Sequence, residues 1–167
     1  MIVAVDVHYT EPGAIAAGVC FEDWADACPA HSAISRFDAV EPYEPGAFYR
    51  RELPCILGLL HAHALRPDIV IVDGHVFLDG NGRPGLGKHL FDALEGRVPV
   101  IGVAKTAFVG IGDDHALLRG DSARPLYVSA AGMPLHLAKS HIETMHGAHR
   151  LPTLLKAADR ACRDAAR

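Results

Sequence analysis

The feature that most limits how this chain can fold is a run of four β-branched residues, Ile69–Val72, enclosed by Asp68 and Asp73. A short, continuous apolar run of this kind is typical of a strand that is buried on both faces of a sheet. A second run, Val98–Ala104, follows after a segment with helical spacing. Parallel strands joined through a helix require right-handed crossovers. We therefore expect an α/β domain.

The remaining elements are expected to complete a mixed sheet with flanking helices. A tight Thr10–Gly13 turn makes the first two strands an antiparallel pair. Apolar spacing predicts the first helix, and Pro67 ends it. The expected strands are 2–9, 13–21, 33–40, 68–73, 98–104 and 125–129; the expected helices are 49–65, a segment from the Gly-rich loop 74–87 to about 94, 135–146 and 154–166. Residues 111–122 are expected to form a loop or short hairpin. The prediction is one domain, 1–167, with an antiparallel start of three strands and a parallel continuation.

Composition agrees with one globular domain, because half of the 167 residues are hydrophobic and only 22% are charged. No apolar run reaches the roughly 18 residues of a membrane span, and the first residues lack the pattern of a secretory signal. We expect a cytoplasmic monomer with no membrane contact. Four scattered cysteines without a CxxC pair favour buried, reduced thiols over zinc or disulfides.

Three carboxylates occupy positions that suit a metal site. Asp6 lies inside the first apolar strand, Glu52 follows a double-proline loop near the start of a helix, and Asp73 ends the central strand. If the two strands are neighbours, Asp6 and Asp73 face the same opening. Oxygen ligands suit Mg²⁺ or Mn²⁺, and such an ion can activate water at a phosphate. Spacing alone leaves an ordinary structural explanation open. Asp6 could be a half-exposed strand residue, Glu52 a carboxylate favoured by the helix dipole, and Asp73 a helix or turn cap.

The local context of these carboxylates resembles a known family, endonuclease V, which nicks nucleic acid near deaminated bases. Five motifs carry the resemblance in the family's order: Val5-Asp6-Val7-His8-Tyr9; Pro42–Glu52, similar to PYxPGxLxxRE; Pro67–His75, similar to PDxxxVDGHG; Pro99–Lys105, similar to PTIGVAK; and Arg150–Pro152 with Ala158-Asp159, similar to RxPxPxRxAD. Together they span nearly the whole chain. The resemblance implies a ribonuclease H-like fold.

The resemblance also implies roles for individual residues. Asp6, Glu52 and Asp73 would hold Mg²⁺ or Mn²⁺ and the attacking water, and Asp159 matches a fourth active-site position. Lys105 would contact a phosphate or stabilise charge. Tyr43 matches the tip of a wedge that separates strands, while Gly46, Gly74 and His75 would border the everted base. The implied reaction hydrolyses DNA or RNA at the second phosphodiester on the 3′ side of hypoxanthine, leaving a 3′-hydroxyl and a 5′-phosphate.

The chain departs from the family pattern around the base pocket. Asp79 stands where a pocket histidine is expected, and an ionised carboxylate cannot donate a hydrogen bond to a base. Met133 replaces a second histidine, and the stretch after Lys105 is shorter. A changed base preference is one reading. Another is a relative that still binds nucleic acid but has lost turnover. The net charge of −4 is not typical of a nucleic-acid-binding protein.

Two glycine-rich segments partly match nucleotide-binding motifs, but both matches are weaker than the endonuclease V resemblance. Gly82–His89 comes within one residue of a P-loop, but His89 replaces the hydroxyl residue that should hold Mg²⁺. A P-loop-type nucleotide-binding protein remains the minor alternative. Gly80–Gly85 satisfies GxGxxG, yet it begins too far after the strand for a dinucleotide site.

Overall fold

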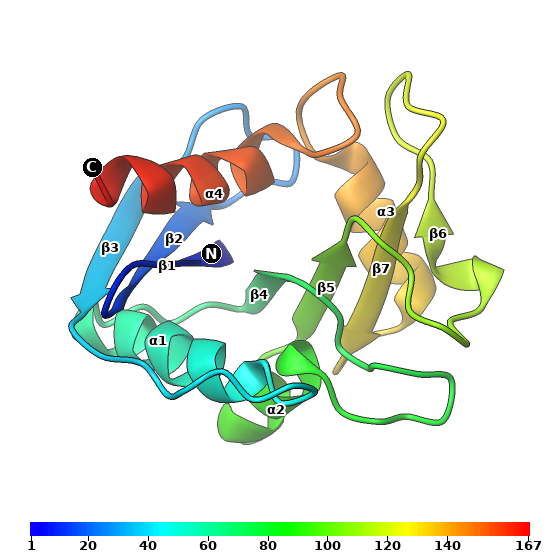
Figure 1. Cartoon of the computed structure of the whole chain (residues 1–167). Coiled ribbons are helices and arrows are strands. Elements are labelled where there is room, and N and C mark those ends of the chain that lie inside the picture. Colours follow the sequence, from blue (N-terminus) through cyan, green and yellow to red (C-terminus); the bar gives the residue numbers. More distant parts are fainter.

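A seven-stranded mixed sheet, in the order β3-β2-β1-β4-β5-β7-β6, forms the centre of the computed structural model, which describes residues 1–167 (Figure 1). Its strands are β1 Ile2–Tyr9, β2 Ala14–Phe21, β3 His31–Phe37, β4 Ile69–Asp73, β5 Val100–Ala104, β6 Ala116–Leu117 and β7 Leu126–Ala131. The helices are α1 Tyr49–Ala62, α2 Leu86–Ala93, α3 Leu135–Thr144 and α4 Thr153–Ala165, with a short 3₁₀ turn at Asp113–His115. The expected α/β class and order of elements are confirmed, with most boundaries shifted by one to three residues.

The strand directions follow the predicted scheme at the start and in the centre. β1 pairs antiparallel with β2 and parallel with β4, and β4 pairs parallel with β5. The expectation of three antiparallel strands and a parallel continuation is confirmed. Beyond β5 the sheet becomes antiparallel again, because β7 pairs antiparallel with β5 and β6 with β7. The carboxyl ends of β1, β4 and β5 therefore lie together at one edge.

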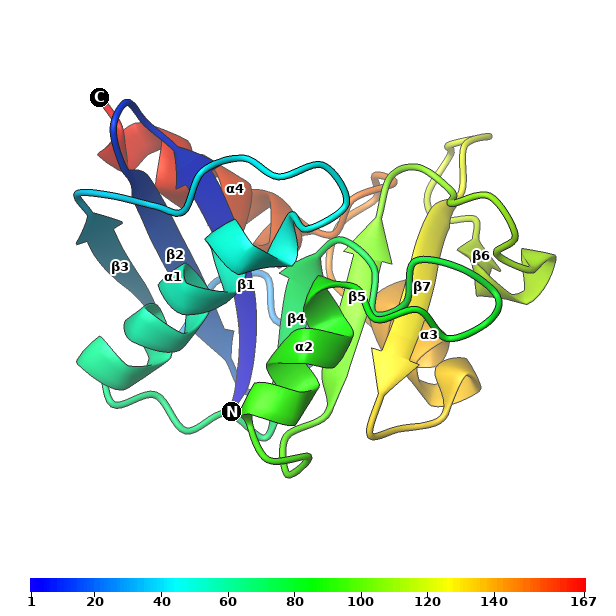
Figure 2. The same ribbon diagram turned by 60° about the horizontal axis from the view of Figure 1, so that its bottom comes forward.

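Helices cover both faces of this sheet (Figure 2). On one face α1 and α2 pack against Val3, Val5 and Val70; on the other, α3 and α4 pack against Ile2, Ala4 and Ile71. Successive side chains of a strand point to opposite faces. Asp6, two residues after Ala4, and Asp73, two after Ile71, therefore extend the rows that face α4.

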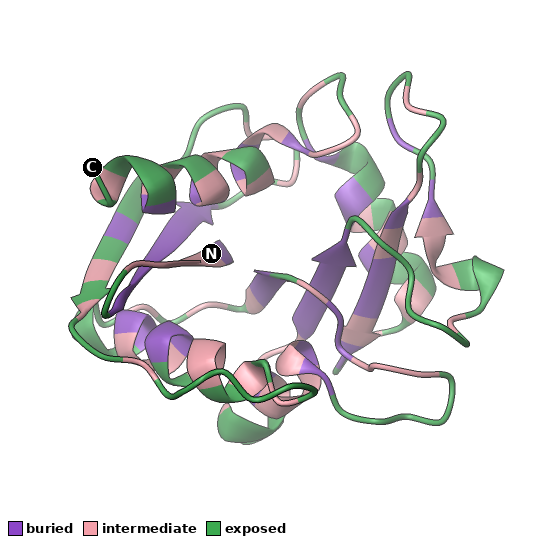
Figure 3. Cartoon of the chain, viewed as in Figure 1, coloured by how far each residue is buried: buried purple, intermediate pink, exposed green.

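Burial explains why the strands are so apolar. All eight residues of β2 are buried, since α1 covers one of its faces and α4 the other (Figure 3). Cys20, Cys55 and Cys162 are buried free thiols, as predicted, whereas Cys28 is exposed in the loop between β2 and β3. The prediction was wrong for Cys28 because a loop offers no core to bury it. No helix has the length and apolar character needed to cross a membrane.

Candidate active site

Asp6 and Asp73 are neighbours at the open edge of the sheet. Val5 pairs with Val72 in the parallel β1–β4 ladder, so the next residue of each strand carries a carboxylate. Asp6 is half-buried, and the side chain of Asp73 is 49% exposed. The predicted placement at one opening is confirmed. It follows from parallel pairing, which puts the ends of both strands at the same edge.

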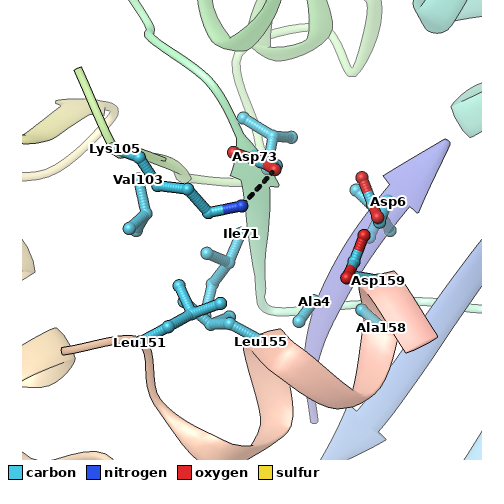
Figure 4. A pocket seen from close by; sticks show the side chains of 12 residues that line it. Ala4, Asp6, Ile71, Asp73, Val103, Lys105, Leu151, Leu155, Ala158 and Asp159 are labelled. Atoms are coloured by element: carbon cyan, nitrogen blue, oxygen red, sulfur yellow. Dashed lines mark ion pairs between the residues drawn. The ribbon is translucent and has the colours of Figure 1, made fainter. Parts of the chain in front are cut away.

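On the α4 side these carboxylates border a small pocket of about 20 Å³ (Figure 4). Its rim carries Asp6, Asp73, Lys105 and Asp159, and its floor is apolar. Lys105 Nζ lies 3.7 Å from Asp73 Oδ2. Figure 4 shows Asp159 of α4 beside Asp6, and the Asp159 carboxylate accepts a hydrogen bond of 2.8 Å from Arg163 Nε. Residues of β1, β4 and α4 and the residue after β5 thus line one pocket.

Glu52 reaches the same two aspartates from the opposite face of the sheet. It lies in the first turn of α1 and, with Asp6 and Asp73, lines a smaller hollow of about 10 Å³. Ile56 and Leu86 close that hollow from α1 and α2. Asp6 and Asp73 therefore border both hollows, with Glu52 on one side and Asp159 on the other.

The electrostatics of this cluster disfavour negative charge. Burial, followed by the nearby Asp73 carboxylate, raises the pKa of Asp6 to about 6. Burial, followed by the Asp6 carboxylate, raises the pKa of Glu52 to about 7. Both shifts have the direction expected of buried acids that repel one another. Lys105 is the cation on the pocket rim, so the carboxylates outnumber it.

The carboxylate oxygens are suitable donors for a hard divalent cation, although the side chains are not close enough to coordinate one ion in this structure. No three Asp, Glu, His or Cys side chains lie close enough to form a metal centre as they stand. Asp6, Glu52 and Asp73 nevertheless line one hollow, and all three supply oxygen. Mg²⁺ and Mn²⁺ prefer such donors and often retain waters in their coordination shell. A divalent cation would also relieve the repulsion among these acids.

A larger pocket of about 470 Å³ adjoins the carboxylates. Glu52 and Asp73 line it together with the aromatic residues Phe48, Tyr49 and Phe108. Gly46, Gly74, His75, Leu78, Gly85 and Leu86 complete the lining. An aromatic-walled pocket of this kind suits a flat, planar group. The pocket shares Glu52 and Asp73 with the carboxylate cluster.

Two glycines that line this pocket have backbone conformations unusual for other residues. Gly46 has φ +80° and Gly74 has φ +139°, in the region that disfavours side chains. Gly74 also has open space where a Cβ would stand. Both glycines therefore leave the backbone beside the pocket without a side chain.

His75 is buried and has a defined tautomer. Its Nε2 lies 2.9 Å from the Thr106 carbonyl, which only accepts hydrogen bonds, so Nε2 carries the proton. Burial lowers the pKa of His75, which favours the neutral ring. The edge of Phe108 packs against it at a centroid distance of 4.4 Å. The histidine thus ties the pocket wall to the loop that follows β5.

Tyr43 and Asp79 lie outside this pocket. Tyr43 is 58% exposed on the loop before α1, where it packs edge-on against Phe48 at 5.4 Å. The Asp79 carboxylate accepts backbone hydrogen bonds from Asn81 and Arg83 and lines a separate hollow with Phe77 and His115. The structure therefore places Tyr43 near the pocket mouth and gives Asp79 a loop-forming contact.

Sequence reasoning did not identify Phe108 or Arg150 as site-shaping residues. Arg150 donates hydrogen bonds to the carbonyls of Lys105 and Pro125, joining the ends of β5 and the start of β7 to the segment before α4. The contacts of Phe108 and Arg150 join residues distant in sequence, and the residue types alone do not predict them. The Arg-Leu-Pro motif at 150–152 was the one available indication for Arg150.

Comparisons with known proteins agree with this geometry. The family model described as Endonuclease V matches residues 1–118. An endonuclease V of Streptomyces coelicolor is 34% identical over 146 residues, covering 75% of this chain and 61% of that relative. The chain therefore spans about three-fifths of the length of that relative.

Solved structures match over nearly the whole chain. The crystal structure of endonuclease V from Streptomyces avermitilis is 29% identical, with a TM-score of 0.76, covering 98% of this chain and 80% of that one. Endonuclease V of Ciona intestinalis, solved with a DNA 23-mer containing an inosine, gives a TM-score of 0.78 at 20% identity, covering 99% and 84%. The ribonuclease H-like fold is confirmed by these neighbours.

Proposed function

Because this chain belongs to the endonuclease V family, we propose that it is a metal-dependent endonuclease that hydrolyses a phosphodiester bond near a deaminated base, in DNA or RNA. One observation carries the proposal: Glu52 and Asp73 line both the carboxylate hollow and the aromatic-walled pocket. A base held in the pocket would bring its own backbone to the carboxylates. The Ciona relative, whose structure holds inosine-containing DNA, supports hypoxanthine as that base.

Asp6, Glu52 and Asp73 are the residues that would hold Mg²⁺ or Mn²⁺. When bound, the ion would polarise the phosphate and supply an activated water. Lys105, which is 3.7 Å from Asp73, would hold that carboxylate in place and stabilise negative charge on the phosphate. Asp159, held by Arg163, would complete the rim beside Asp6. The products would be a 3′-hydroxyl and a 5′-phosphate, from the second bond on the 3′ side of the base.

Residues around the pocket would select and extrude the base. Gly46 and Gly74 leave room for the backbone to approach it. Phe108 would stack on its face or edge, and Tyr43 would enter the space that the base vacates. A flipped base costs less to extrude when its pairing is already weakened by deamination. The role proposed for His75 is to hold the pocket wall, because its Nε2–H is already engaged.

Nicking of an inosine-containing strand in Mn²⁺ tests the proposal. We expect cuts at one position relative to inosine, and no cuts in a matched strand that carries adenosine. Asp73→Asn should abolish cleavage while the protein stays folded. Tight binding without any cut would instead support the second candidate, a nucleic-acid-binding relative that has lost turnover, which the Asp79 and Met133 departures favour.

The P-loop alternative loses support from the surroundings of Lys88. The glycine run precedes α2, but Lys88 Nζ lies 2.6 Å from the Asp92 carboxylate one turn later. A nucleotide phosphate would have to compete with that ion pair. A rise in the melting temperature of the protein with ATP or GTP would support the P-loop alternative.

A further inference from the structure

The carboxyl-terminal part of this acidic chain carries a local excess of positive charge. Residues 150–167 contain five arginines and lysines against two aspartates, a net charge of +3, whereas the whole chain has −4. Three of these cations already have partners. Arg150 binds backbone carbonyls, Arg163 pairs with Asp159, and Arg167 pairs with Asp164.

Lys156 and Arg160 are the two cations that form neither an ion pair nor a side-chain hydrogen bond, and both are exposed. They are four residues apart on α4, so they project from one side of the helix about 6 Å apart. Lys156 lies in the first turn of α4, where the helix dipole adds positive potential. These two side chains form an uncompensated pair.

The pair borders a groove of about 470 Å³, here called the α4 groove, lined by His149, Leu151, Thr153, Lys156, Arg160 and Asp164. Leu151 lines both this groove and the catalytic pocket of Figure 4. Arg160 also follows Asp159 directly in the sequence. The groove and the carboxylate pocket are therefore adjacent and share Leu151.

We propose that the α4 groove binds the phosphate backbone of the nucleic-acid strand beyond the cleaved bond, with Lys156 and Arg160 as its two phosphate contacts. The inference rests on the proposed nucleic-acid substrate. A protein with a negative overall charge needs a local cationic surface to attract a polyanion. Asp164, the acid in the groove, is already paired with Arg167, so the groove keeps its positive character.

The test measures binding as a function of salt in the Asp73→Asn background, so that the strand stays intact. Each phosphate contact contributes about 0.7–0.9 to the slope of log affinity against log salt. We expect Lys156→Gln with Arg160→Gln to lower that slope by about 1.4–1.8 and to weaken binding of a long inosine strand roughly 10-fold at low salt. A strand that ends just beyond the cleaved bond should bind the variant and its parent equally.

The matched control is Arg66→Gln with Arg97→Gln, which removes the same charge before β4 and β5, at the opposite edge of the sheet. It should leave the slope nearly unchanged, and Lys156→Arg with Arg160→Lys should retain the parental slope. An unchanged slope in the α4 variant, or an equal loss in the control, would overturn the proposal. So would a lower cleavage rate at saturating substrate, since it would place these residues in the chemistry.

The two proposals fail in different ways. If the parent protein cuts no inosine strand while the α4 variant still lowers the slope, the nuclease assignment is wrong and the groove stands. If cleavage is normal and the slope does not depend on α4, the groove is wrong and the nuclease stands.

Discussion

Lys105 Nζ lies 3.7 Å from the Asp73 carboxylate, at the edge where β4 and β5 end side by side. Both side chains are about half exposed, so their attraction alone contributes little to stability. The Lys105–Asp73 pair is important because of its position in the site. It places one cation on the rim of a pocket that also carries Asp6 and Asp159.

Lys105→Met should therefore impair cleavage far more than folding. We expect the single-turnover rate on an inosine strand in Mn²⁺ to fall about 100-fold, the range for loss of one electrostatic stabiliser. Lys105→Arg should recover part of the rate because it keeps the charge. The melting temperature should change little in both. A rate within a factor of three of the parent for Lys105→Met would remove Lys105 from the proposed mechanism.

The placement of Asp6 and Asp73 could be predicted from local rules once the resemblance to a ribonuclease H-like sheet made their strands neighbours. Apolar runs predicted both strands, and parallel pairing of neighbours put their ends at one edge. The alternation of side chains along a strand also fixes the face on which each aspartate lies. The pairing of β1 with β4 joins residues far apart in sequence, and local rules alone do not predict it.

Other parts of the site depend on contacts that no local rule predicts. Glu52 approaches from the face opposite to Asp159, and this follows from how α1 and α4 pack on the sheet. Phe108 reaches His75 through the path of a loop. The resemblance suggested a pocket role for Asp79, but its carboxylate is engaged by its own loop. Backbone hydrogen bonds of a Gly-rich turn decide that arrangement.

Glu52→Gln should stabilise the metal-free protein at high pH. The folded state raises the pKa of Glu52 from 4.5 to about 7, so folding favours the protonated acid. Above about pH 7 the charged carboxylate destabilises the fold, and this cost disappears as the pH falls toward 4.5. We expect the variant to gain about 1–3 kcal/mol in free energy of unfolding at high pH, with the gain absent near pH 4.5. Urea denaturation with EDTA measures both.

Adding Mn²⁺ should reverse the order at high pH. A ligand that binds only the folded state stabilises it, and the parent keeps all three carboxylates. The Glu52→Gln variant should gain less from Mn²⁺ than the parent. Equal stabilisation of both proteins would show that Glu52 does not hold the ion.

Arg119→Met should destabilise the fold strongly. Arg119 is 5% exposed, and its guanidinium donates hydrogen bonds to the carbonyls of Ile142, Met145 and His149. Removing it leaves these acceptors unpaired around the end of α3 and the segment before α4. We expect a loss of about 2–4 kcal/mol in free energy of unfolding, measured in urea. Arg124→Met, at an exposed position, should change it by less than about 0.5 kcal/mol.

Phe108→Ala should weaken recognition of the base while sparing the chemistry. Phe108 is 41% exposed at the pocket wall and packs edge-on against His75. Stacking of a base on an aromatic ring contributes about 1–3 kcal/mol, so the KM for an inosine strand should rise roughly 10-fold or more, with kcat within a few-fold of the parent. Phe108→Trp should restore KM, and Val109→Ala, at the 96% exposed neighbour, should leave it unchanged. A fall in kcat with an unchanged KM would mean that Phe108 positions the catalytic residues instead of the base.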